Sequence, residues 1–203
     1  MFLMPRLVLR QKINQNKYYF SVIKDSDKKI RWWVWVAIFC ILFVDQVIKV
    51  WVKTNMLIGE EIVITDWFIL HFVENNGFAF GLEFFGSAGK VLLTVFRVVF
   101  SFFVFRWLIA TIRLGGSRWV VFAMILIFSG AVGNIIDSVF YGFVFDYAPL
   151  LFGRVVDMFY FPLIVEEVSG STIFFPFIFN IADSCITIGA FILLFNYKHL
   201  NLK

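Results

Sequence analysis

Four segments of the chain are apolar over a length that can cross a lipid bilayer, and they limit the possible folds more than any other feature. They lie at about 32–52, 90–112, 119–136 and 177–196. A helix needs about 20 apolar residues to span the hydrocarbon core. The chain is 61% hydrophobic, whereas soluble domains contain about 45–50% apolar residues. The sequence therefore predicts an all-α integral membrane protein, with four transmembrane helices in a single domain over residues 32–203.

The charged residues predict how these helices are oriented. Residues 1–31 contain eight Lys or Arg against two Asp. They indicate a basic cytoplasmic tail, and nucleic-acid binding is disfavoured because no folded module accompanies them. The turn 113–118 is also basic, whereas the connections 53–89 and 137–176 are mainly acidic. Because Lys and Arg concentrate in cytoplasmic loops, we expect both termini in the cytoplasm and the two longer connections outside.

The outer connection at 60–85 has the composition of a small sheet. Residues 62–65 and 67–73 are rich in β-branched and aromatic side chains, which is typical of strands. Asn75-Asn76-Gly77 then ends the pattern with residues that favour turns. We expect an extended or sheet element at the outer membrane surface, where it could rest on lipid or cover a site between the helices.

Two pairs of polar residues lie near the ends of predicted helices. Asp45 and Lys49 are four residues apart, and Asn134 and Asp137 are three apart, so each pair shares one helix face. The first pair could be an internal ion pair. The second follows two glycines that permit close helix packing, so it could form hydrogen bonds between helices. Spacing alone does not separate these structural roles from functional ones.

Two further acids, Asp157 and Asp183, lie in apolar sequence, with Asn180 one helical turn before Asp183. A charged side chain in hydrocarbon costs about 2.5–3.5 kcal/mol on insertion scales, so such acids indicate a functional site. Two carboxyl groups that share a site cannot both ionise easily, and such a pair can activate water and protonate a leaving amine. Three interpretations are open: a catalytic pair, the relay of a small proton-coupled transporter, or structural contacts in a non-enzymatic scaffold.

Taken in order, the polar motifs resemble those of one protein family. They are Asp45-Gln46-Val47-Ile48-Lys49, Glu74-Asn75-Asn76-Gly77-Phe78-Ala79-Phe80, Gly133-Asn134-Ile135-Ile136-Asp137, Val155-Val156-Asp157 and Phe179-Asn180-Ile181-Ala182-Asp183-Ser184. Each motif is weak by itself. All five in this order, over about residues 32–196, resemble the lipoprotein signal peptidase (signal peptidase II) family.

The resemblance implies a four-helix aspartic endopeptidase of the bacterial inner membrane, with its active site toward the outer face. Such an enzyme removes signal peptides from prolipoproteins on the N-terminal side of a Cys that carries a diacylglyceryl group. Asp157 and Asp183 would be the catalytic pair. The supporting polar residues would be Asp45, Lys49, Asn75, Gly77, Asn134, Asp137 and Asn180. The expected partners are lipid-modified prolipoproteins and membrane lipids, and we expect a monomer without nucleic acid, metal or cofactor.

The sequence departs from the family pattern at two positions where the family has Arg, and in the length of one connection. Glu74 stands where the family often has Arg, and Ser138 follows Asp137 where it usually has Arg. The stretch from Asp137 to Asp157 is longer than usual, and within it Asp146 lies in a second sequence that resembles the motif of the first catalytic acid. The match around Asp157 is closer. We therefore predict that Asp157 is that acid and that 143–153 is an insertion in an outer loop.

Overall fold

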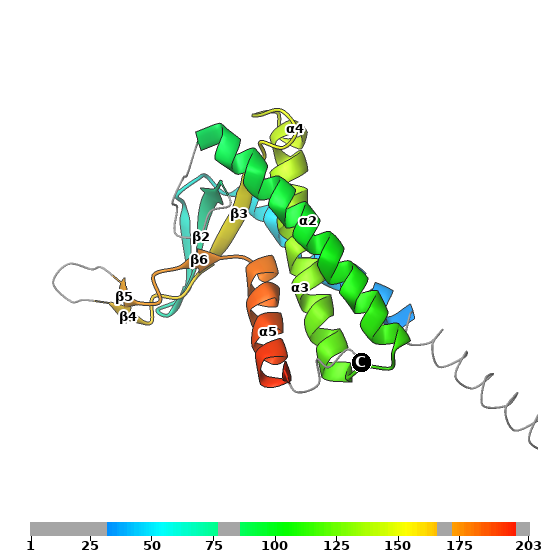
Figure 1. The fold of residues 1–203 in the computed structure, drawn as a ribbon. Coiled ribbons are helices and arrows are strands. Elements are labelled where there is room, and N and C mark those ends of the chain that lie inside the picture. The colour runs from blue at the N-terminus through cyan, green and yellow to red at the C-terminus, as the bar shows by residue number, and fades with distance from the viewer. Residues whose placement is uncertain (1–31, 77–85, 166–171, 198–203) are drawn as a thin grey trace, which may run out of the picture.

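The structure is a computed structural model that describes residues 32–76, 86–165 and 172–197. Gly77, one of the predicted site residues, lies outside them. The described helices are an N-terminal helix (Trp32–Asn55), α2 (Gly86–Arg113), α3 (Arg118–Ile136), the π-helix η2 (Asp137–Tyr141), α4 (Gly142–Val144) and α5 (Ile181–Phe195). α3 packs against both α2 and α5, and η2 and α4 continue it upward in Figure 1. The fold is mostly helical, as the sequence predicts.

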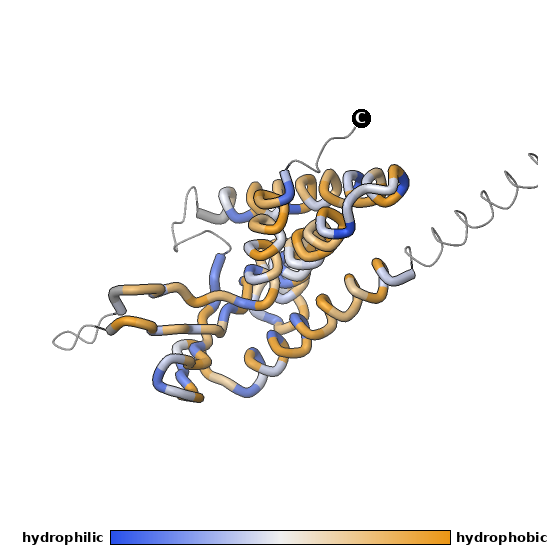
Figure 2. Tube along the Cα trace, turned by 90° about the horizontal axis from the view of Figure 1, so that it is seen from below, coloured by the Kyte–Doolittle hydropathy of each residue, from blue (hydrophilic) through white to orange (hydrophobic). Residues whose placement is uncertain are grey.

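Within the described ranges, three helices are long and apolar enough to cross a membrane: Trp32–Asn55, Ala88–Arg113 and Arg118–Val144. Apolar residues predominate along them in Figure 2. On α2, for example, Leu92 is 67% exposed and Phe103 is 64% exposed. Apolar surface on this scale is unfavourable in water and suits a lipid environment. The prediction of apolar membrane helices is confirmed for these three segments.

The fourth predicted segment, 177–196, forms a shorter helix than expected. α5 is apolar and 15 residues long. It begins at Ile181 because Asn180 caps it: the Asn180 side chain accepts a hydrogen bond from the Asp183 amide at 2.9 Å. The Asp183 side chain accepts one from the Asn180 amide at 3.4 Å in return, which completes a capping box. The residues before the cap, Ile178–Phe179, form strand β6 instead.

A four-stranded antiparallel sheet lies beside the upper end of α5 in Figure 1. Its order is β1 (Glu61–Thr65), β2 (Phe68–Asn75), β3 (Val155–Tyr160) and β6. The strands predicted at 62–65 and 67–73 correspond to β1 and β2, so that prediction is confirmed. β4 (Ile164–Val165) and β5 (Thr172–Phe174) form a separate pair.

The sheet joins parts of the chain that are far apart in sequence. Val73 of β2 lies opposite Asp157 of β3, and Phe159 of β3 lies opposite Phe179 of β6. The end of β2, the middle of β3 and the start of α5 therefore meet at one place. All three segments carry predicted site residues.

The segment predicted as an outer-loop insertion, 143–153, folds back onto the end of α3. Its first residues belong to α4, and its later residues return along η2, where the Gly153 amide donates to the Ser138 carbonyl at 3.0 Å. A Cβ on Gly153 would lie 2.1 Å from the Asp137 carbonyl oxygen, so only glycine permits this approach. The close contact places the start of β3 directly beside η2.

Glycines also allow α3 and α5 to pack with their backbones in contact. A Cβ on Gly130 would lie 2.3 Å from the Ala182 carbonyl oxygen, and one on Gly189 would lie 2.7 Å from the Ala123 carbonyl oxygen. Small residues are favoured at such interfaces between apolar helices. α5 and the Asp183 side chain are thus held tightly against α3.

Candidate active site

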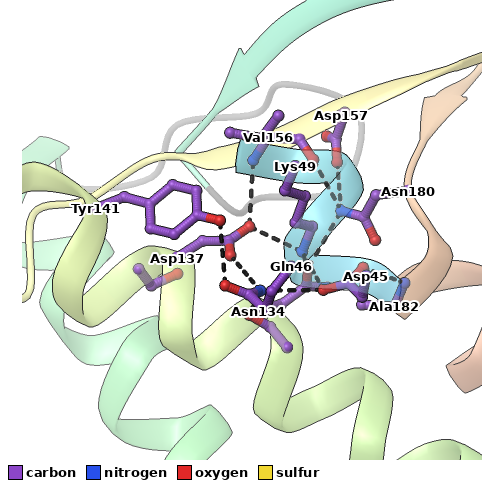
Figure 3. Close-up of polar contacts among 12 residues, drawn as sticks. Asp45, Gln46, Lys49, Asn134, Asp137, Tyr141, Val156, Asp157, Asn180 and Ala182 are labelled. Atoms are coloured by element: carbon purple, nitrogen blue, oxygen red, sulfur yellow. Dashed lines mark hydrogen bonds and ion pairs between the residues drawn. The ribbon is translucent and has the colours of Figure 1, made fainter. Parts of the chain in front are cut away.

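Polar side chains from four separate segments gather between the helices and the sheet (Figure 3). They come from the N-terminal helix, from the end of α3 with η2, from β3, and from the start of α5. The cluster contains Asp45, Gln46, Lys49, Asn134, Asp137, Asp157, Asn180 and Asp183. Most of these side chains are buried, and Lys49, Asp137 and Asn180 are fully so.

Lys49 is the centre of a buried ion triad. Its Nζ lies 3.1 Å from Asp45 Oδ2 and 2.8 Å from Asp137 Oδ2. It also donates to Asn134 Oδ1 at 2.9 Å. Burying charges costs several kcal/mol per ion, which is offset only by close partners and further hydrogen bonds. Both pairs that the helical spacing predicted are therefore parts of one network.

The carboxylates of this triad also hold the chain segments that carry the two remaining acids. The Ala182 amide donates to Asp45 Oδ1 at 3.0 Å, which fixes the start of α5. The Val156 amide donates to Asp137 Oδ2 at 3.3 Å, which fixes β3. The triad thus positions Asp157 and Asp183 through backbone contacts at the neighbouring residue of each.

Asn180 lies between Asp157 and the helix that bears Asp183. Its Nδ2 donates to Asp157 Oδ1 at 2.6 Å, while its Oδ1 caps α5 at the Asp183 amide. Asn134 completes the link, because its Nδ2 donates to Asp183 Oδ1 at 2.8 Å. Two asparagine amides therefore set the relative position of the two acids.

The two acids lie in different environments. Asp157 is 3% exposed, and burial together with the nearby Asp183 carboxylate raises the pKa of Asp157 to about 7. Asp183 is only partly buried and lies in the first turn of α5. Two carboxyl groups in unlike environments can take different parts in proton transfer.

Asn75 contributes from the end of β2. Its Nδ2 donates to Asp157 Oδ2 at 3.2 Å, so Asp157 accepts side-chain hydrogen bonds on both oxygens. The next residue, Asn76, accepts a hydrogen bond from Lys90 of α2 at 3.2 Å. The Asn75-Asn76 motif therefore contacts both β3 and α2.

Asp146, the sequence alternative to Asp157, lies apart from the cluster. It is exposed and has a φ of 56° in the turn after α4. Asp157 instead contacts Asn180, which caps the helix of Asp183. The geometry brings Asp157 and Asp183 together and keeps Asp146 on the surface.

Three contributors lie outside the predicted set of site residues. Gln46 donates to Asp137 Oδ1 at 3.0 Å, and Tyr141 donates to Gln46 Oε1 at 3.1 Å. Arg97 of α2 donates to Ser138 Oγ at 3.3 Å. A detectable signal exists for Arg97, since it is a charged residue in the middle of an apolar segment. Tyr141 has no such signal, because it resembles the other aromatic residues around it.

Glu74, which like Ser138 departs from the family pattern, forms an ion cluster at the edge of the site. It pairs with Lys53 of the N-terminal helix and with Arg154, whose Nη1 lies 3.3 Å from Glu74 Oε2. Lys53 also lies over the Tyr147 ring, with Nζ 4.3 Å from the ring centroid. Glu74 therefore links β2 to the segment before β3 through its ion pair with Arg154.

Comparisons with known proteins agree with this architecture. The family model described as signal peptidase (SPase) II matches residues 37–198. The chain is 43% identical to a lipoprotein signal peptidase of Porphyromonas gingivalis, over 77% of this chain and 79% of that one. It is 33% identical to a lipoprotein signal peptidase of Amoebophilus asiaticus, over 80% of this chain and 75% of that one.

A solved structure is similar as well. It is a bacterial membrane enzyme determined by the in meso method, with a TM-score of 0.59 and 26% sequence identity, and the match covers 81% of this chain and 86% of that one. The family match extends over most of the chain and includes all the described polar residues of the cluster. The chain belongs to the signal peptidase II family.

Proposed function

We propose that this chain is an aspartic endopeptidase of the bacterial inner membrane. It cleaves signal peptides from diacylglyceryl-modified prolipoproteins on the N-terminal side of the modified Cys. Membership of a signal peptidase family supports the substrate class. One observation carries the aspartic mechanism: Asn180 donates to Asp157 at 2.6 Å and caps the helix on which Asp183 lies.

Asp157 and Asp183 have different roles in the proposed mechanism. The pKa of Asp157 is raised to about 7 by burial and by the Asp183 carboxylate, so Asp157 holds a proton near neutral pH and acts as the general acid. Asp183 lies in the first turn of α5 and acts as the general base. Efficient acid–base catalysis needs groups whose protonation states are poised near the working pH.

Hydrolysis then proceeds in two steps without a covalent enzyme intermediate. Asp183 takes a proton from water as the water oxygen attacks the scissile carbonyl carbon, and Asp157 gives its proton to the carbonyl oxygen. In the second step the C–N bond breaks, Asp183 gives its proton to the leaving amine, and a hydroxyl of the diol returns a proton to Asp157. The amine belongs to the lipid-modified Cys, and both acids end in their starting states.

The proposed membrane arrangement places this chemistry near the outer surface. α5 serves as the fourth span, and α2, α3 and α5 alternate in direction in Figure 1. With the basic turn 113–118 in the cytoplasm, both termini are cytoplasmic and the sheet lies at the outer face. Residues 1–31 form the cytoplasmic tail, and the domain from 32 onward works as a monomer. The transporter interpretation finds no support in the family and is not proposed.

The test is a cleavage assay with the purified full chain in detergent and a diacylglyceryl-modified prolipoprotein. We expect Asp157→Asn and Asp183→Asn each to lower the rate at least about 100-fold, because each removes a proton-transfer group. Mass spectrometry of the product identifies the cleaved bond. Detergent carries no proton gradient, so cleavage there also separates a peptidase from a proton-coupled transporter.

Asp146→Asn is the matched control, because it makes the same substitution in the other acid of a similar sequence motif. It should keep a rate within about twofold of the wild-type rate, since exposed polar substitutions have small effects. Normal cleavage by Asp157→Asn, with loss of cleavage in Asp146→Asn, would assign the general acid to Asp146 instead.

A further inference from the structure

The β4–β5 pair projects from the sheet to one side of α5 (Figure 1) and carries part of an exposed apolar surface. This surface, which we call the apolar patch, consists of Trp67 in the turn between β1 and β2, Leu163 and Ile164 at β4, and Phe174 and Phe177 at and after β5. Trp67 is 56% exposed and Phe174 is 54% exposed. A large exposed apolar patch marks a contact surface, so we expect the apolar patch to be covered in the cell.

Ring contacts join the apolar patch to the sheet. The centroid of the Trp67 ring lies 6.0 Å from that of Phe161, and Phe161 lies 5.6 Å from Phe179 of β6. Phe179 in turn lies 5.8 Å from Phe175, and Phe175 lies 5.7 Å from Phe177. Aromatic rings at such separations attract each other. The apolar patch is therefore part of one layer of rings, and β6 connects that layer to α5.

α5 alone is too short to cross the hydrocarbon core of a bilayer. Its 15 residues correspond to about 22 Å at the rise of an α-helix, whereas the core is about 30 Å thick. The chain becomes polar at Asn196, directly after α5, but residues 173–179, before the Asn180 cap, are apolar. The missing length therefore lies on the outer side, at the level of the apolar patch.

The apolar patch continues the surface that α5 exposes to lipid. Figure 1 shows the β4–β5 pair at the height of the first turns of α5, and Figure 2 shows both strands mainly in the orange of hydrophobic residues. Residues 158–165 and 172–179 contain no charged side chain. Ile188 and Phe191 of α5 are exposed apolar residues as well. The lipid that surrounds α5 therefore reaches the apolar patch.

Two features limit the depth of the apolar patch to the interface between hydrocarbon and headgroups. Glu166 and Glu167 follow β4 directly in the sequence, and carboxylates are costly in hydrocarbon. Among the described strands, β4 and β5 pair only with each other, so their outer sides carry backbone groups that need water. Aromatic side chains such as Trp67 are favoured at the interface.

We propose that the apolar patch inserts into the outer interface of the bilayer and anchors the sheet to lipid beside α5. The inference rests on the membrane arrangement proposed above, in which α5 is the fourth span. β3 carries Asp157, and β6 leads into the helix of Asp183, so the anchor holds both acids at a fixed depth. A diacylglyceryl group holds the substrate Cys at the same interface, because its acyl chains lie in the hydrocarbon. The anchor thus aligns the two acids with the bond to be cleaved.

The test places an environment-sensitive fluorophore (NBD) on single cysteines of the full chain, in which Cys40 and Cys185 are replaced by Ser. The labelled protein is reconstituted into phosphatidylcholine vesicles, with and without acyl chains that are brominated close to the headgroup. Bromine quenches the fluorophore only on contact. We expect the label of Phe174→Cys to emit at the shorter wavelength typical of an apolar environment, and to lose most of its fluorescence in the brominated lipid.

Two further positions calibrate the measurement. Phe191→Cys is the reference inside the bilayer, because Phe191 is exposed on α5. Leu150→Cys is the matched control outside it, because Leu150 is also an exposed apolar residue. It follows the 27-residue segment Arg118–Val144, which is longer than the core at about 40 Å, so its label should stay unquenched. Trp67→Cys should be quenched like Phe174→Cys, and it replaces that variant in the test if Phe174→Cys does not fold.

An unquenched label at Phe174 or Trp67 of a folded variant, with a quenched label at Phe191, would overturn the inference. If that unquenched label still emitted at short wavelength, the apolar patch would be covered by protein instead of lipid. An unquenched label at Phe191 would remove the proposed fourth span and the inference with it. Failure of the peptidase mechanism is distinct, because Asp157→Asn would then cleave normally while the labels still reported contact with lipid.

Discussion

At the scale of single residues, the protonation of Asp157 depends on the amides that contact it. Asn75 donates to one oxygen at 3.2 Å and Asn180 to the other at 2.6 Å. Both favour the ionised form, whereas burial and the Asp183 charge favour the protonated form, and the balance raises the pKa of Asp157 to about 7. The general acid must be protonated, so activity should fall as the pH rises through this value.

Asn75→Ala should therefore move the alkaline limb of the pH–rate profile to higher pH. The variant removes a donor that stabilises the carboxylate, so the pKa of Asp157 rises and the acid stays protonated over a wider range. A hydrogen bond to a charged group contributes about 1.5 kcal/mol or more, which corresponds to about one pH unit. Asn55→Ala, the same substitution at an exposed asparagine, is the control. An alkaline limb of Asn75→Ala that stays in place or moves to lower pH would contradict this account.

The residues of the site differ in how far the sequence reveals them. Asp45 with Lys49, and Asn134 with Asp137, follow from helical spacing, because spacing fixes which side chains share a face. That these two pairs form one network does not follow, since it depends on how two different helices approach each other, and Lys49 and Asn134 are 85 residues apart in sequence. Arg97 is detectable only as a charge in an apolar segment, and Ser138 only as a departure from the family pattern; neither feature indicates that the two side chains form a hydrogen bond.

At the scale of elements, the contact between α3 and α5 determines where Asp183 lies. A Cβ on Gly189 would lie 2.7 Å from the Ala123 carbonyl oxygen and 3.2 Å from Leu126 Cβ. Backbone atoms of α3 cannot move aside, so α5 would have to shift. Gly189→Ala should lower the free energy of unfolding by about 1–3 kcal/mol, which is typical of overpacking, and should also lower the cleavage rate.

Thermal unfolding in detergent, followed by tryptophan fluorescence, measures the effect of Gly189→Ala. Ala190→Leu is the control, because Ala190 is the next residue on α5 and is exposed, so the substitution adds bulk at an exposed position. The control should melt within about a degree or two of the wild type, as surface substitutions do. Equal melting temperatures for the two variants would show that the α3–α5 contact adapts to the added methyl group.

The strands illustrate what an amino-acid pattern can and cannot predict about elements. β1 and β2 are predicted correctly, because β-branched and aromatic residues form continuous runs there. β3 and β6 are not, since Val155–Tyr160 lies in apolar sequence around an acid and Ile178–Phe179 is only two residues long. Both become strands through pairing with distant partners, and the start of α5 is set by the Asn180 cap rather than by hydrophobicity.

At the scale of the whole molecule, the connections and ends of the described helices lie at two opposite ends of the fold. The turn between α2 and α3 and the end of α5 lie at one end, whereas the sheet and α4 lie at the other (Figure 1). The first end is flanked by Arg113 and Arg118, and basic residues of this kind remain in the cytoplasm. The proposed site then opens toward the outer surface, where lipid-modified precursors would reach it.

Single cysteines at the two ends test this orientation with a maleimide that does not cross membranes. Leu114, in the α2–α3 turn, is 64% exposed, and Asp146, after α4, is also exposed. In a chain whose native cysteines, Cys40 and Cys185, are replaced by Ser, Asp146→Cys should react in intact spheroplasts. Leu114→Cys should react only after the membrane is permeabilised. The reverse pattern would place the two acids on the cytoplasmic side, where the proposed peptidase could not act on exported prolipoproteins.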